Sequence, residues 1–140
     1  MKKIEDKIFR IIDVNLNRSQ EGLRVCEEVI RFIFDDIKLT KKAKRLRHSI
    51  VNTVKLLPIN HKELLSFRDS NSDVGKSPSK WERKRINYKQ IFTANIQRAK
   101  ESLRVLEEFS KIINERVSER FKSIRYQVYT LESETADKFF

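Results

Sequence analysis

Residues 15–28, NLNRSQEGLRVCEE, recur as residues 95–108, NIQRAKESLRVLEE, at a constant offset of 80. Eight of the 14 paired positions are identical, and six of those eight are polar or charged. A repeat that served only to build a hydrophobic core would need to keep its apolar positions alone. The repeat therefore indicates two copies of a polar surface as well as two copies of a scaffold.

A second pair of strings follows the first. Residues 39–48, LTKKAKRLRH, align with residues 117–126, VSERFKSIRY, at an offset of 78. Each unit reads as a long segment, a short turn and a second segment, and one connection has lost two residues. The period is longer than the roughly 50 residues of common solenoid repeats, so two copies predict a duplicated helical hairpin that closes on itself.

Composition favours one all-α domain. The 140 residues include only two Gly and two Pro, which gives too little turn chemistry for an all-β fold. No apolar run approaches the ~18 residues of a membrane span, and the N-terminus lacks the pattern of a signal peptide. The single cysteine fits a reducing, cytoplasmic setting. We expect Cys26 to be a core residue, because it aligns with Leu106.

The apolar period predicts long amphipathic helices that form an antiparallel four-helix bundle. We expect continuous helices over residues 4–35 and 40–57 in the first unit. In the second unit we expect a long helix whose apolar period starts upstream, at residue 88, and whose apolar stripe includes residue 113, followed by a helix over 115–133. The second helix of each unit should be the shorter one. The domain, 1–140, divides into repeat one (4–57), a central segment (58–86) and repeat two (87–135). The central segment holds a short helical turn at 60–65 and a long crossover loop.

The net charge of +11 suits nucleic acid, an anionic small molecule or a merely solvated surface. The lysines are scattered and are densest over residues 38–47, without the interleaved aromatic residues of single-strand binders. We therefore disfavour nucleic acid and keep a basic RNA-binding bundle only as a third hypothesis.

The repeat contains two kinds of polar position. Asn17, Glu21, Arg24 and Glu28, with their partners in the second copy, form a stripe whose simplest role is a solvated salt-bridge ladder. Asn15 and Arg18, like Asn95 and Arg98, lie on the shoulder of the apolar stripe. An Asn/Arg pair at that boundary either recognises a phosphate, which the planar guanidinium fork matches, or joins the two hairpins.

Familiar catalytic motifs are missing. Gly75-Lys76-Ser77 resembles the end of a P-loop, but Ser70 stands where its first glycine should be, and Pro78 follows. His48 and His61 have no zinc-ligand spacing. Because His48 aligns with Tyr126, we expect a packed, aromatic-like position there.

Residues 13–25, 46–48, 68–75 and 95–108 together resemble the alternative hydroxymethylpyrimidine phosphate kinase family of thiamine biosynthesis, which is unrelated to the ribokinase-like enzymes. The resemblance extends over essentially the whole chain, to residues 129–132. It implies transfer of a phosphoryl group from ATP, with Mg²⁺, to a pyrimidine monophosphate, giving the diphosphate. Family members occur alone or fused ahead of thiamine phosphate synthase. The chain resembles the stand-alone form, so a synthase is a candidate partner, and a homodimer stays open.

Chemistry then suggests roles for particular residues, because phosphoryl transfer depends on positioning, cations and Mg²⁺. We predict catalytic roles for Arg18, Arg68, Asp73 and Arg98, and phosphate or substrate binding by Asn15, Arg47, Gly75, Asn95 and Arg125. The candidate Mg²⁺ ligands are Asp69, Asp73 and Glu108. The alternative hypothesis, from another class, is a non-catalytic helical module that binds or feeds thiamine phosphate synthase.

Overall fold

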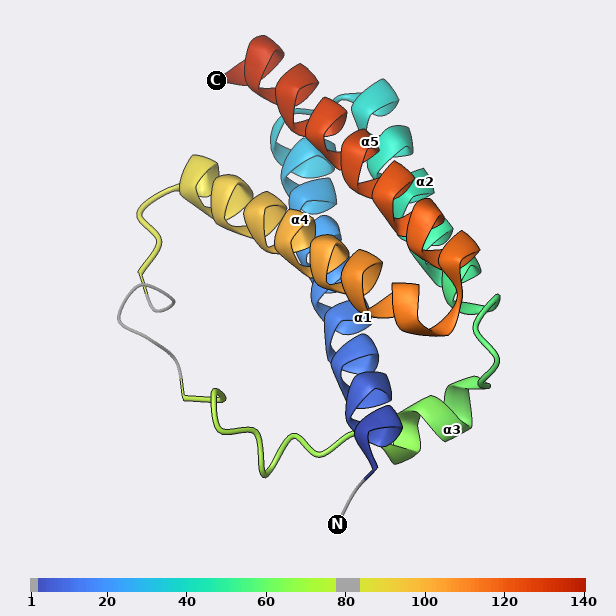
Figure 1. Cartoon of the computed structure of the whole chain (residues 1–140). Helices are drawn as coiled ribbons and strands as arrows, with labels where there is room; N and C mark the ends of the chain where they lie inside the picture. Colours follow the sequence, from blue (N-terminus) through green and yellow to red (C-terminus); the bar gives the residue numbers. More distant parts are fainter. Residues whose placement is uncertain (1–2, 78–83) are drawn as a thin grey trace.

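The computed structural model describes residues 3–77 and 84–140, and within these ranges every regular element is helical. Figure 1 shows the order along the chain. The elements are α1 (Ile4–Glu28), the π-helical turn η1 (Val29–Ile33), α2 (Ile37–Val54), α3 (His61–Ser66), α4 (Tyr88–Ile113) and α5 (Glu115–Phe139). The predicted all-α class is confirmed. No helix in the described ranges is both long enough and apolar enough to cross a membrane.

The four long helices pack in a closed ring. α1 contacts α4 and α2, and α5 contacts α4 and α2, so each hairpin is held by the other at two places. In Figure 1, α4 crosses α1 while α2 and α5 run side by side. The short helix α3 lies against α1.

The core is built from equivalent positions of the two copies. Ile12 and Leu23 are fully buried, as are their counterparts Phe92 (1% exposed) and Leu103 (0%). Cys26 is also buried, as predicted, and burial raises the pKa of its thiol. Ile33, which falls within the continuous helix expected over residues 4–35, is half exposed, because the π-helical turn changes the angular spacing at the end of α1.

Small residues set the distance between α1 and α4 at their crossing. A Cβ added to Gly22 would lie 2.8 Å from the backbone oxygen of Asn95 and 3.5 Å from the Cβ of Ala99. Ser19 and Ser102, which are buried here too, fold their hydroxyl groups back onto carbonyls of their own helices. Repeat one therefore meets repeat two through positions within the repeated string.

The connections explain the change in offset from 80 to 78. Three residues, 34–36, join the first hairpin, whereas Asn114 alone joins the second. Asp36 caps α2 by accepting from the N–H of Leu39, and Asn114 caps α5 in the same way. The expectation that α5 is a shorter helix ending near residue 133 is wrong: it has 25 residues, as many as α1. Its last turn is held by Phe139, which stacks on Phe34.

Candidate functional site

A cavity lies where α1 crosses α4, and it is lined by the duplicated polar residues of both copies. We call it the crossing cavity; its volume is about 490 Å³. Its lining pairs each residue with its repeat partner: Asn15 with Asn95, Arg18 with Arg98, Glu21 with Glu101, and Gly22 with Ser102. Val105 and three loop residues, Asp73, Gly75 and Lys76, complete the lining. The structure thus brings four of the predicted site residues of the repeats into one place.

The two asparagines are held in the same way. Asn15 donates through Nδ2 to the carbonyl oxygen of Ile11 (2.9 Å), and Asn95 donates to that of Ile91 (2.8 Å). These bonds to the preceding turn fix the orientation of each side chain. Within the described part of the chain, neither amide oxygen has a hydrogen-bond donor of its own, so both can accept from a ligand.

The two arginines of the crossing cavity are uncommitted. Arg18 and Arg98 are exposed, and over residues 3–77 and 84–140 neither guanidinium takes part in a hydrogen bond or an ion pair. Their neighbours Arg24 and Arg104 are both paired with glutamates. No described contact of Arg18 or Arg98 joins the two hairpins, so the structure does not support that role for them. Two planar guanidinium groups that line one cavity instead suit a phosphate.

The central loop is docked on the N-terminal half of α1. Arg68 forms two hydrogen bonds of 2.8 Å to the carboxylate of Asp13, which is only 2% exposed. Arg10 donates to the backbone oxygen of Asp69 (2.8 Å), and Phe67 stacks on Phe9. The hydrogen bonds that Arg68 donates to Asp13 raise the pKa of Arg68. Arg68 therefore fastens the loop, a role that the sequence did not predict for it.

A larger cavity, of about 870 Å³, lies between α1 and this docked loop. We call it the loop cavity. Besides the loop, it is lined by Lys7, Arg10, Ile11 and Val14 of α1. Asn15, Arg18, Glu21 and Asp73 border both cavities, so the two form one depression. Asn87, the N-cap residue of α4, and Gln90 of α4 occupy the repeat positions of Lys7 and Arg10, so repeat two does not repeat these two cations.

The loop residues predicted to contact phosphate or Mg²⁺ lie at the junction of these cavities. Asp73 accepts from the N–H of Gly75 through Oδ1 (2.9 Å), and its carboxylate lines both cavities. Gly75 lines the crossing cavity. A Cβ there would make only an ordinary 3.5 Å contact with Asp73, so the fold itself does not require glycine at this position.

The proposed Mg²⁺ ligands do not all come together. Asp69 and Asp73 line the loop cavity, as does Glu21. Glu108 lies elsewhere, bonded to Lys111 and close to Arg104, and the hydrogen bond from Lys111 lowers its pKa. In the described ranges no three His, Cys, Asp or Glu side chains are grouped to hold a metal. Carboxylates and phosphates with retained waters are nevertheless the usual ligands of Mg²⁺, and Asp69 and Asp73 are chemically suited to that.

Arg47 and Arg125 lie away from both cavities, in contrast to the expectation. Arg47 makes two bonds to the buried Glu27, of 3.1 and 3.0 Å. Arg125 makes two to Glu107, of 3.2 and 3.0 Å. These pairs are repeat equivalents that join the two helices of each hairpin. The physical reason for the difference is that the guanidinium fork matches carboxylate and phosphate equally well.

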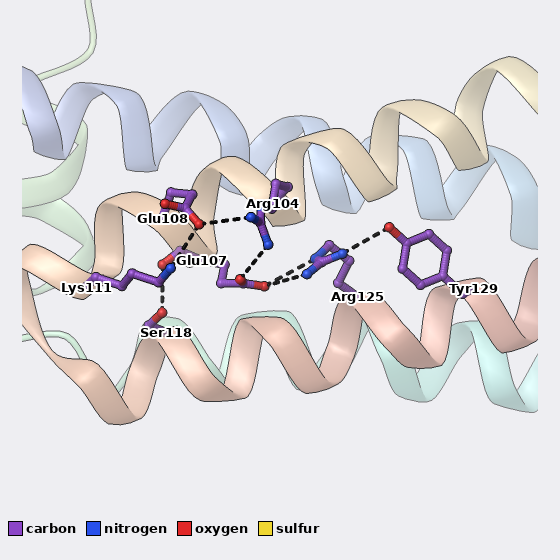
Figure 2. A network of polar contacts seen from close by, with 7 residues as sticks. All are labelled: Arg104, Glu107, Glu108, Lys111, Ser118, Arg125 and Tyr129. Atoms are coloured by element: carbon purple, nitrogen blue, oxygen red, sulfur yellow. Dashed lines mark hydrogen bonds and ion pairs between the residues drawn. The ribbon is translucent and has the colours of Figure 1, made fainter.

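Figure 2 shows the network of the second copy. The carboxylate of Glu107 accepts hydrogen bonds from Arg125 of α5 and from Arg104 of its own helix (2.9 Å). Its backbone oxygen accepts a hydrogen bond from the hydroxyl group of Ser118 (2.7 Å). Burial alone would lower the pKa of Arg125, but its hydrogen bonds to Glu107 and Tyr129 outweigh burial and raise it. The network thus joins α4 to α5 within the second hairpin, and we call it, with the equivalent Glu27–Arg47 pair of the first hairpin, a buried clamp.

Known proteins identify the family. Residues 10–134, most of the chain, match the ThiD2 family. The chain belongs to the ThiD2 family. The resemblance to a family of thiamine biosynthesis is thereby confirmed at this level.

This ThiD2 chain is similar to part of several larger proteins. It is 38% identical over 133 residues to the thiamine-phosphate synthase of Nostoc punctiforme, covering 94% of the chain and 36% of that protein. The thiamine-phosphate synthase of Synechocystis sp. is 39% identical over 127 residues, which are 90% of the chain and 35% of that protein. The chain thus spans about a third of the length of these curated relatives. No solved structure gives a significant match.

Several residues of the candidate site were missed from the sequence. Glu21 and Glu101 line the crossing cavity, although the repeat suggested only a solvated ladder for them. Lys7 and Arg10 lie outside the repeated strings, so no sequence pattern marked them, and Lys76 was noted only as part of a poor match to a P-loop. His48 and Tyr126, expected to be packed, are both exposed.

Proposed function

We propose that this ThiD2 chain is a kinase of thiamine biosynthesis that converts hydroxymethylpyrimidine phosphate to its diphosphate with ATP. The observation that carries the proposal is the convergence of Arg18 and Arg98, one from each repeat, on a single cavity that Asp73 borders; neither arginine has a partner among the residues that the structure describes. A reaction that brings two phosphates together needs at least two such cationic groups.

Phosphoryl transfer to this acceptor requires no general base from the protein. The acceptor is a phosphate whose second pKa is about 6, so at neutral pH its oxygen attacks without a general base. Positioning, cations and Mg²⁺ supply most of the rate enhancement in phosphoryl transfer. Mg²⁺ would be held by Asp73, together with Asp69, and by the phosphates themselves; when bound, it neutralises the charge on the phosphate oxygens.

The relatives support the pathway. Proteins named thiamine-phosphate synthase carry a segment like this chain as about a third of their length, and the resemblance of the repeat and loop strings is to the kinase. A chain that makes the diphosphate would supply the substrate of such a synthase.

The test is direct turnover. Purified protein is incubated with ATP, Mg²⁺ and the pyrimidine monophosphate, and formation of the diphosphate and ADP is followed by ion-exchange chromatography or ³¹P NMR. We expect stoichiometric formation of both products that ceases on chelation of Mg²⁺. Absence of the diphosphate, with binding to a thiamine-phosphate synthase retained, would favour the non-catalytic module instead.

A further inference from the structure

The two cavities differ in a way that the repeat does not explain. The crossing cavity is lined by both copies, whereas the loop cavity belongs to repeat one and the central loop alone. A reaction between two unlike phosphates requires two unlike half-sites. This inference rests on the proposed kinase function and adds which ligand each half-site holds.

We propose that the loop cavity binds the nucleoside triphosphate and the crossing cavity binds the pyrimidine monophosphate, with Arg18 contacting the phosphoryl group in transfer. The loop cavity is the larger, at about 870 Å³ against about 490 Å³. The nucleotide is the larger ligand, and this volume is within the usual range of ligand pockets, roughly 300–1,000 Å³.

The lining supports this assignment. Ile11, Val14 and Val74 give the loop cavity an apolar wall for a base, and Lys7 and Arg10 lie along the same side of α1. Arg98 and Asn95 line the crossing cavity only. They offer a guanidinium fork and an amide oxygen, neither of which has a partner among residues 3–77 and 84–140, and these match the phosphate and an amino group of a pyrimidine monophosphate.

Arg18 lies where the two cavities meet, with Asp73 beside it in the lining of both. In the transfer, an oxygen of the acceptor monophosphate forms a bond to the γ-phosphorus of the nucleotide. The bond from that phosphorus to the β–γ bridging oxygen breaks, and the nucleoside diphosphate leaves with the electron pair. No proton needs to move when the acceptor is a dianion. In this assignment Arg18 contacts the phosphoryl group in transfer, and Arg98 contacts the acceptor phosphate.

The assignment is tested by binding, separately from turnover. Isothermal titration calorimetry uses a non-hydrolysable β,γ-imido nucleoside triphosphate with Mg²⁺ and, separately, the pyrimidine monophosphate. Arg98→Ala should raise the Kd of the monophosphate roughly 10- to 100-fold, as expected for loss of a charged hydrogen bond, and leave that of the nucleotide within about twofold. Lys7→Glu should show the opposite pattern: it should raise the Kd of the nucleotide and leave that of the monophosphate nearly unchanged.

Two valines give a matched steric test. Val14 lines only the loop cavity and Val105 only the crossing cavity, and both are half-buried on a helix. Val14→Phe should block binding of the nucleotide, and Val105→Phe should block binding of the monophosphate. Arg120→Ala, which removes an exposed cation of α5 that lines neither cavity, controls for net charge and should change neither Kd.

The ligands should also bind together, so saturating monophosphate must not abolish binding of the nucleotide analogue. Competition between them, a reversed pattern, or equal weakening of both ligands by Arg98→Ala would overturn this assignment and leave the kinase proposal standing. A wild-type protein that binds neither ligand would overturn the kinase proposal itself.

Discussion

Two sets of charged residues within the same repeated string have opposite surroundings. Arg18 and Arg98 are exposed at the crossing cavity and have no partner in the described part of the chain. Glu27 and Glu107, nine residues further along each copy, are instead 2% and 3% exposed and held by Arg47 and Arg125. Identity between repeats therefore marks buried scaffold and exposed cavity lining alike. Burial and pairing, which only the fold supplies, tell them apart.

The buried clamps should give the largest effects on stability. Glu107→Ala would leave Arg125 buried without its carboxylate, which costs about 3–5 kcal/mol for a broken buried pair. Glu27→Ala should cost less, because the side chain of Arg47 is 18% exposed against 9% for Arg125. Urea unfolding of the purified variants measures both values.

A double variant sharpens this prediction. Glu107→Leu combined with Arg125→Met removes both charges and should recover most of the lost stability, since apolar replacement of a buried pair is often neutral. Equal, small losses at Glu107 and Glu27 would contradict the view that these pairs are buried clamps.

Core truncation should act equally on the two copies. Leu23→Ala and Leu103→Ala remove repeat-equivalent side chains that are both 0% exposed, and each should cost about 2–5 kcal/mol. Thermal or urea unfolding checks this. Losses below half a kcal/mol at both positions would place these leucines outside the core and break the equivalence of the copies.

The sequence was sufficient for the scaffold because apolar spacing and repeat offset are local properties. The helices and the burial of Leu23 and Leu103 follow from periodicity alone. The roles of Arg47 and Arg125 could not follow in the same way, because a guanidinium suits a carboxylate and a phosphate equally. Choosing between them required knowing that Glu27 and Glu107 are buried beside them.

The site was predictable where the repeat marked it and not elsewhere. Asn15, Arg18 and their partners were singled out as duplicated polar residues on the edge of an apolar stripe. The docking of Arg68 on Asp13 was not foreseen, because it joins residues 55 positions apart in sequence and the duplication offers no counterpart. The roles of Arg18, Arg98 and Asp73 in binding or turnover stay predictions.

An intermediate effect is expected where the copies touch. Gly22→Ala should destabilise the protein by about 1–3 kcal/mol, the usual cost of overpacking, because the new Cβ meets the backbone oxygen of Asn95 at 2.8 Å. That cost opposes the gain of up to about 1 kcal/mol that alanine normally brings to a helix. Ser102→Ala, at the equivalent position, adds no atom and is the control. A stabilised Gly22→Ala protein would show that α1 and α4 are further apart.

The smallest effect on stability is expected at Asp73, on the loop that Arg68 fastens to repeat one. Asn can keep the bond that the Oδ1 of Asp73 accepts from Gly75, so Asp73→Asn removes charge and little else, and should change the free energy of unfolding by less than about 0.5 kcal/mol. If Asp73 binds Mg²⁺, the same variant should lower kcat about 100-fold or more and raise the Mg²⁺ concentration needed for half-maximal rate. Melting without ligand and a Mg²⁺ titration of turnover measure the two effects.

Glu108→Gln, which alters a carboxylate outside both cavities, is the matched control and should leave turnover within about twofold of wild type. A kcat for Asp73→Asn close to wild type at saturating ATP and Mg²⁺ would reduce the loop to a structural element, and the contrast between the loop and the clamps would then rest on packing alone.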